Sequence, residues 1–198
     1  MIKKLLNPFA YFDDKLLLII GLIAHLFFSY ICYLTDSYFP DFLSIQKIKI
    51  DFSFVDIIYQ NTRNVLIAIL LLYFYGKFIN PKTRFIDIIN VVLISRIAYY
   101  IVFITDFIPF INQKINKVTE GVLSNDLTIL QNPSIMITVV IVGFFALFCM
   151  AIMFYYLYRG FKTVTNLKNT KQTLGYIAVI FLLILSTTIL ALIIPQKL

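Results

Sequence analysis

Residues 85–111 form a nearly continuous apolar run that contains three ionisable residues, Asp87, Arg96 and Asp106. At about 1.5 Å of helical rise per residue, such a run can cross a hydrocarbon core of about 30 Å. Asp87 and Asp106 lie near its two ends, where their side chains can reach an interface. Arg96 lies about 15 Å deep by helical rise, and a central arginine costs about 2.5–3.5 kcal/mol. We therefore expect Arg96 to face other helices, a polar cavity or a lipid headgroup.

Four other apolar runs reach about 20 residues, so the sequence predicts an all-α, polytopic transmembrane helix bundle. Hydrophobic residues make up 61% of the chain and charged residues 14%, against about 45–50% and 25% in soluble domains. Strands of a membrane barrel would be about ten residues long with alternating polarity, unlike these runs. We expect a single integral membrane domain over residues 1–198, with five spans at about 16–35, 57–79, 86–111, 134–158 and 174–194.

The segments between the predicted spans are mostly short and polar. Residues 36–56 are predicted to form an outer loop, in which the alternating pattern of residues 48–54 indicates a short extended or interfacial piece. Pro109 is expected to end or kink the third span near the outer surface. Residues 112–133 are predicted to form a second outer loop that could include a short helix.

Basic residues are distributed unequally between the two sides of this topology. Ten Lys or Arg residues lie on one side, in residues 1–15, the 77–84 turn and the 159–173 loop. The other side has six. Because short cytoplasmic loops are enriched in Lys and Arg, we predict a cytoplasmic N-terminus and an outside C-terminus. The net charge of +7 is explained by this asymmetry, and no nucleic-acid partner is expected.

Two polar residues in different spans lie at similar depths. His25, the only histidine, is nine residues into the first span, and Arg96 is ten residues into the third from the same side. If these spans touch, a neutral His25 could accept a hydrogen bond from Arg96, and the pair could hold an anion or a lipid phosphate. In the alternative, Arg96 satisfies backbone carbonyls, Asn90 or tyrosines and locks the bundle. His25, Asn90 and Arg96 are therefore the candidate polar core or ligand site.

Polar residues also open the second span. Gln60 and Asn64 are four residues apart and share one helix face. That face points either into the bundle or toward the headgroups, and the sequence favours neither.

The 159–173 loop contains four basic residues and no acidic residue. Contact with anionic lipid headgroups would contribute about 1 kcal/mol for each basic residue near the surface. The alternative is that the basic residues only fix the orientation of the chain. The candidate headgroup contacts are Arg159, Lys162, Lys168 and Lys171.

No signature of catalysis or metal binding is found in the sequence. It lacks HExxH, GxSxG, a Walker-type glycine loop and CxxC. Asp87 and Asp106 lie about 28 Å apart along one helix, too far for paired aspartyl chemistry. Cys32 and Cys149 differ in predicted depth by about 10 Å, so neither a disulfide nor a metal pair is expected. We expect no catalytic residues, no metal and no cofactor.

Several stretches resemble bacterial members of the YIP family, which are grouped with the Ypt/Rab-interacting membrane proteins. They are LLNPFAYF before the first span, KTRFIDIINVVLISRIAYY at the third, and YLYRGFKTVTNLK after the fourth. The resemblance implies a five-helix bundle of the bacterial cytoplasmic (inner) membrane with a role in membrane organisation, trafficking-like scaffolding or transport support. It supplies no catalytic residues.

The sequence is compatible with two functions. The first is a non-enzymatic membrane-organising scaffold or partner-interaction protein, with a membrane-protein partner or a second copy of the chain and Arg96 as part of a structural core. The alternative is a small transporter or channel-like subunit that binds an anion or a lipid headgroup around Arg96 and His25.

Overall fold

The computed structural model describes residues 2–47, 52–194 and 196, and these residues form a helical bundle. Five helices are long and apolar enough to cross a membrane, which confirms the predicted all-α five-span architecture. The chain is therefore a multi-pass membrane protein. The spans are α2 (Asp14–Leu34), α3 (Phe54–Ile79), α4 (Phe85–Tyr100) extended by a 3-10 segment (Ile101–Phe107), α6 (Pro133–Thr165) and α7 (Thr170–Ile193).

Short elements lie outside the spans. Two strands, β1 and β2, form a small antiparallel pair between α2 and α3, with Ser37 opposite Lys47. The remaining elements are α1 (Ile2–Leu6), a 3-10 turn (Pro8–Ala10), β1 (Ser37–Tyr38), β2 (Gln46–Lys47), α5 (Pro109–Leu123) and a 3-10 turn (Leu127–Gln131).

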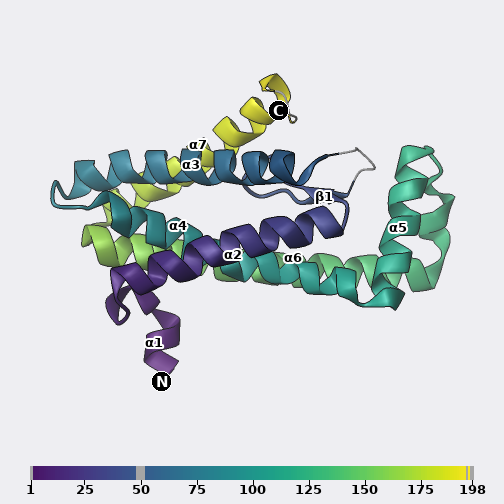
Figure 1. Ribbon diagram of the computed structural model, residues 1–198, viewed down its shortest axis with the longest axis horizontal. Coiled ribbons are helices and arrows are strands. Elements are labelled where there is room, and N and C mark those ends of the chain that lie inside the picture. Colours follow the sequence, from purple (N-terminus) through teal and green to yellow (C-terminus); the bar gives the residue numbers. More distant parts are fainter. Residues whose placement is uncertain (1, 48–51, 195, 197–198) are drawn as a thin grey trace.

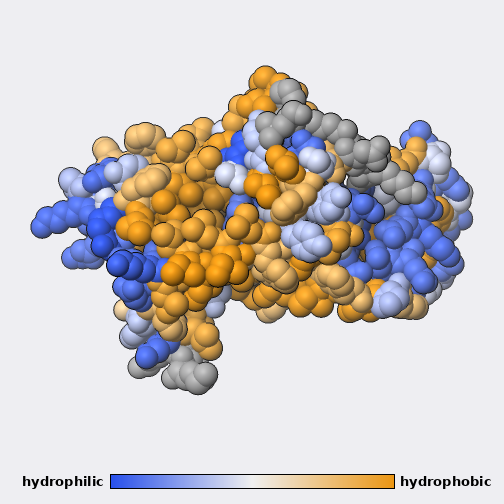
Figure 2. Space-filling view, in the orientation of Figure 1, coloured by the Kyte–Doolittle hydropathy of each residue, from blue (hydrophilic) through white to orange (hydrophobic). Residues whose placement is uncertain are grey.

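The third span is the centre of the bundle. α4 packs against α2, α3 and α6, whereas α7 packs mainly against α3. The spans run along the long axis of the molecule, α5 lies across this axis at one end, and α1 projects near the other (Figure 1). An apolar band covers the middle of the molecule between two polar ends (Figure 2). This distribution matches a bundle in a bilayer, with α5 and α1 close to its two surfaces.

Local sequence signals explain where several helices begin and end. Ser53 and Asp56 form a capping box at the start of α3, in which each side chain accepts a hydrogen bond from the other's backbone N–H. The side chain of Asn132 accepts from the N–H of Ser134, and Pro133 follows as the first residue of α6. Pro109 ends the third span, as predicted, because α5 begins there in a new direction.

Three predicted span boundaries differ from the structure by four residues or more, including the start of the fifth span, which lies at Thr170 rather than at residue 174. The third span ends at Phe107 rather than at residue 111, since the helix tightens into a 3-10 segment and then gives way to α5. The fourth span was predicted to end at residue 158, but α6 continues to Thr165 and ends at Asn166, which has a left-handed backbone (φ 56°). Much of the predicted 159–173 loop is therefore helical, and only residues 166–169 connect α6 to α7.

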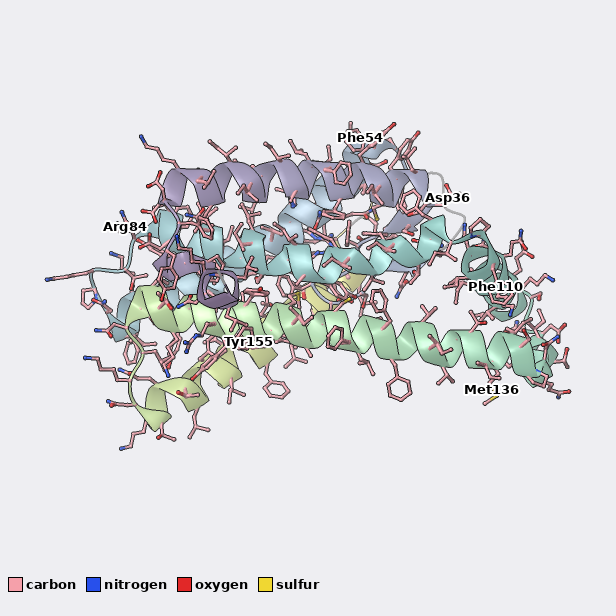
Figure 3. All side chains as sticks on the ribbon, turned by 90° about the horizontal axis from the view of Figure 1, so that it is seen from below. Asp36, Phe54, Arg84, Phe110, Met136 and Tyr155 are labelled. Atoms are coloured by element: carbon pink, nitrogen blue, oxygen red, sulfur yellow. The ribbon has the colours of Figure 1, made fainter. Side chains whose placement is uncertain are left out.

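The length of α6 exceeds the hydrocarbon core. Its 33 residues correspond to about 50 Å by helical rise, against a core of about 30 Å. In Figure 3, Met136 on α6 lies beyond Asp36 and Phe54, which mark the corresponding ends of α2 and α3. The start of α6 therefore projects past the neighbouring spans and packs there against α5.

The predicted first outer loop does not lie on the surface. Residues 37–42 are all buried, so this segment turns back among the helices. Most of the extended piece predicted at residues 48–54 lies outside the described residues, and Phe54 already belongs to α3.

Candidate functional site

Arg96 lies in the core of the bundle with no exposed surface. Its Nη1 donates a hydrogen bond to the backbone carbonyl of Phe42, and its Nη2 donates to Oδ1 of Asn61 at 3.1 Å. A longer contact of 3.4 Å joins Nε to the hydroxyl of Tyr100. Hydrogen bonds to a charged group contribute about 1.5–3 kcal/mol each, so the first two are enough to offset the cost of a central arginine.

Four aromatic rings surround the guanidinium. Its central carbon lies 4.8 Å from the ring centroid of Phe42 and 5.1 Å from that of Tyr100, with Phe39 and Tyr99 within 6 Å. A desolvated cation over an aromatic face gains about 2 kcal/mol or more. No carboxylate of the described residues forms an ion pair with Arg96. Its positive charge is thus balanced by carbonyl and amide dipoles and by ring faces.

Asn61 connects three helices through its amide. Its oxygen accepts from Arg96 and, at 2.9 Å, from the hydroxyl of Tyr100. Its nitrogen contacts Oγ of Ser29 at 2.9 Å and Nδ1 of His25 at 3.3 Å. An asparagine amide offers two donors and one oxygen with two lone pairs, so every position is used. α2, α3 and α4 are therefore held together by one side chain.

His25 does not form a hydrogen bond with Arg96, although both belong to the same polar cluster. Asn61 stands between them, and the other ring nitrogen of His25 lies 3.1 Å from the hydroxyl of Thr62. A neutral imidazole with the proton on Nε2 accepts from Asn61 and donates to Thr62. Both nitrogens are thus engaged with protein groups. The predicted direct hydrogen bond between Arg96 and His25 is replaced by a bridge.

The buried loop at residues 37–42 completes the site. Its backbone carbonyls point at donors on the helices: the carbonyl of Phe39 accepts from Asn64 at 3.1 Å, and that of Pro40 accepts from Arg63 at 2.7 Å. The next two carbonyl acceptors are those of Phe42, bonded to Arg96, and Leu43, bonded to the hydroxyl of Tyr99. A backbone segment inside a bundle needs such partners because no bulk water is present to satisfy it.

The polar start of α3 faces this loop. Gln60 and Asn64 are both fully buried, which resolves their orientation in favour of the bundle interior. The side-chain oxygen of Gln60 accepts from the N–H of Phe39 at 3.3 Å, and its nitrogen donates to the carbonyl of Gln196 at 2.7 Å. α7 adds Thr187, whose hydroxyl accepts from the N–H of Phe42 at 3.4 Å.

Asn90 lies apart from this cluster. It is six residues before Arg96, about 9 Å along α4, and its side-chain nitrogen donates to the carbonyl of Asp14 at 3.0 Å. Its side-chain oxygen is buried without a partner among the described residues. Asn90 therefore ties α4 to the start of α2 rather than contributing to the surroundings of Arg96.

The four candidate headgroup contacts gather at the opposite end of the bundle from α5. Arg159 and Lys162 lie on the last turns of α6, Lys168 lies in the 166–169 connection and Lys171 lies in the first turn of α7. All four are exposed. Their side chains are thus carried mainly by helix ends, which places them at fixed positions that a long loop would not provide.

The described residues contain no group of three His, Cys, Asp or Glu side chains close enough to hold a metal ion. Cys32 and Cys149 are separate, buried thiols. In this site the polar atoms bond mostly to one another and to backbone, and Nη1 of Arg63 is buried without a partner among the described residues. The evident effect of this polar cluster is to join α2, α3, α4 and the loop.

The sequence singled out Arg96 and His25 but missed the groups that join them. Backbone carbonyls and tyrosines were among the alternative partners expected for Arg96, but neither Tyr100 nor the carbonyl of Phe42 was singled out, and Asn61 was not assigned a role. The run of amides at residues 60, 61 and 64 was the available signal. Comparison with known proteins adds no relative: no protein-family model matches the chain, and neither a curated protein nor a solved structure is significantly similar to it.

Proposed function

We propose that this chain is a non-enzymatic membrane protein of the YIP type that acts as a membrane-organising scaffold or as an interaction partner of another membrane protein. The observation that carries the proposal is the complete enclosure of Arg96 by protein groups. A residue that binds a transported ion must be reachable by that ion, whereas Arg96 has no exposed surface and each of its three side-chain nitrogens already bonds to a protein group. Arg96 instead holds the 37–42 loop and, through Asn61, two neighbouring helices.

The surface of α6 supports a role in interaction within the membrane. Its projecting half leaves large apolar side chains uncovered by the other helices, and Gly143 has no atom within 4 Å of an added Cβ. Helices associate in membranes through packing at small residues as well as through polar contacts. The exposed side chains include Met136, Ile137, Val140, Ile141, Phe144 and Phe148.

Two measurements test this proposal. A photo-crosslinking amino acid at Phe144 should give one discrete product with a partner or a second copy in native membranes, whereas the same probe at Phe27 on α2 should not. Both positions are exposed phenylalanines, so the pair controls for nonspecific capture. Purified protein in vesicles should leave anion permeability unchanged. An anion flux that is abolished by Arg96→Met would overturn the scaffold role.

The alternative, a small transporter or channel-like subunit, is favoured by one specific observation. A lipid-facing groove of about 450 Å³ along α3 is lined partly by Thr62, whose hydroxyl contacts His25. The side chain of Thr62 thus lies between His25 and this lipid-facing groove. In this alternative an anion or lipid headgroup would reach the His25–Asn61–Arg96 cluster from the side, and Thr62→Val would reduce the flux.

We further propose that the N-terminus and the four headgroup-contact residues face the cytoplasm of a bacterial cell, in the cytoplasmic membrane. The support is the charge of this end, which carries Lys77, Lys82 and Arg84 as well. A periplasm-sensitive reporter fused after residue 198 should be active. Activity of a cytoplasm-specific reporter at that position would reverse the orientation or change the number of spans.

A further inference from the structure

An apolar groove of about 530 Å³ lies between α6 and α7 on the perimeter of the bundle. Its walls are almost entirely hydrocarbon and aromatic, and they come from both helices. Ile177 and Phe181 remain largely exposed on its rim. The lining includes Phe154 and Tyr158 from α6 and Tyr176, Ile177, Ile180 and Ile184 from α7.

The groove has the length of one bilayer leaflet. Thr173 and Ile184 mark its ends on α7, eleven residues apart, which corresponds to about 16 Å of helical rise. Half of a hydrocarbon core of about 30 Å is about 15 Å. A straight acyl chain that starts at the membrane surface would therefore occupy the whole groove and end near the bilayer midplane.

The aromatic wall of the groove is held in place by neighbouring rings. The ring of Tyr176 lies 5.5 Å from that of Tyr158 and 5.0 Å from that of Phe161, measured between centroids. Phe161 in turn stacks on Tyr75 of α3 at 6.0 Å. The groove is thus formed without its occupant, which lowers the ordering cost of binding.

Basic side chains lie at the mouth of the groove. Lys162 is one turn beyond Tyr158 on α6, and its Nζ is 5.9 Å from the centroid of that ring. Lys171 lies in the first turn of α7 two residues before Thr173, so it starts from the helix face turned away from the groove, and Lys162 is the basic residue next to the groove wall. Arg159 and Lys168 add two more exposed charges, and no acidic residue occurs between residues 159 and 173. The mouth of the groove therefore attracts a negatively charged group at the depth of the lipid phosphates.

We propose that the α6–α7 groove binds an anionic glycerophospholipid, with one acyl chain along the groove and the phosphate beside Lys162. The combination of an apolar channel of one-leaflet length and a basic mouth matches this class of molecule. A transmembrane helix of a partner would be thicker than an acyl chain and would make no use of the four positive charges. This site goes beyond the scaffold role and does not depend on it.

The test compares phosphatidylglycerol with phosphatidylcholine on the purified full chain in detergent, with lipid binding counted by native mass spectrometry. Lys162→Gln should weaken phosphatidylglycerol binding about fivefold, since a basic residue near the surface contributes about 1 kcal/mol. The control Lys4→Gln/Lys15→Gln removes two exposed charges from the same end of the chain and should change the affinity less than twofold.

A second variant tests the groove itself. Ile177→Trp fills the channel from its exposed rim, so the core packing is preserved while binding of phosphatidylglycerol falls at least fivefold. Equal affinity for both lipids, or phosphatidylglycerol binding that resists both variants, would overturn the proposal. If inorganic phosphate binds saturably and Ile177→Trp leaves the binding of phosphatidylglycerol unchanged, only the headgroup is recognised and the groove is not the binding site. A change of oligomeric state in Ile177→Trp, with lipid binding intact, would assign the groove to a second copy.

Discussion

The third and fourth spans are positioned in different ways. Two thirds (67%) of an 18-residue stretch of the third span is buried, against 17% in α6. The third span carries Arg96 and Asn90 into the protein, whereas the buried face of α6 is mostly apolar. In a bilayer, apolar side chains gain little from leaving lipid for protein, so packing fit and polar contacts decide which helices associate. The comparison teaches that α4 is fixed by specific hydrogen bonds, while much of α6 is left free to contact lipid or partners.

The largest effect is expected at the amide that joins three helices. Asn61→Leu leaves Arg96 with one strong hydrogen bond and should lower the free energy of unfolding by about 3–5 kcal/mol, roughly 10 °C in Tm. Asn90→Leu is the matched control, because it removes one hydrogen bond from an equally buried asparagine and should cost about 1 kcal/mol. Thermal unfolding in detergent measures both, and equal losses would refute a special role for Asn61.

A phenylalanine pair tests the same contrast between core and perimeter. Phe42→Ala removes a fully buried ring next to Arg96 and should destabilise the protein by about 3–4 kcal/mol. Phe144→Ala changes a ring on α6 that is 69% exposed, and a shift below about 0.5 kcal/mol is expected. Both losses are obtained from unfolding in a denaturing detergent. Similar values would mean that the outer half of α6 is packed in the membrane.

Two glycines on α6 separate its packed end from its free part. An added Cβ at Gly160 would lie 2.7 Å from the ring of Phe9 and 2.9 Å from Val91, so Gly160→Ala should cost about 1–3 kcal/mol. Gly143→Ala meets nothing and should stabilise the helix by about 0.5–1 kcal/mol. The measured quantity is the difference in Tm between the two variants. A loss at Gly143 would indicate that this face is already occupied by a second copy.

The smallest effects concern two tyrosine hydroxyls. The hydroxyl of Tyr99 donates to the carbonyl of Leu43, so Tyr99→Phe should cost about 1 kcal/mol. The hydroxyl of Tyr176 is buried without a partner among the described residues, and Tyr176→Phe should leave stability within about 0.5 kcal/mol of the wild type. Thermal scans of the two variants side by side check this order. A larger loss for Tyr176→Phe would reveal a partner for its hydroxyl.

The sequence predicted the helices whose positions depend only on the length and hydropathy of an apolar run. The five apolar runs and Pro109 gave the spans and the end of the third one because the bilayer fixes how many apolar residues a helix needs. Residues 159–165 are polar on average, and hydropathy gave no reason to extend the fourth span through them. That segment stays helical because Gly160 and Phe161 pack against Phe9 and Tyr75, contacts between segments far apart in the chain.

The site was predictable only in part for a similar reason. A central arginine stands out in an apolar run, and equal depth suggested His25 as a neighbour. The carbonyls of Phe42 and Leu43 carry no residue-specific signal, since every residue has one. A loop rich in Phe and Tyr gave the only hint that residues 37–42 would turn inward. Asn90 was grouped with Arg96 because both lie in one apolar run, although six residues of helix place them about 9 Å apart along the axis and about 120° apart around it.

The inward turn of residues 37–42 has a consequence for biogenesis. This loop leaves the ribosome before four of the five spans, yet its N–H at Phe42 finds its acceptor on Thr187 of the last helix. The contact of Gln60 with Gln196 likewise forms only after α7 has been synthesised. Until α7 packs against α3, the N–H of Phe42 lacks its acceptor on Thr187, so α7 completes the hydrogen bonding of the loop. The step that makes this protein resistant to quality-control proteases would then be the docking of α7.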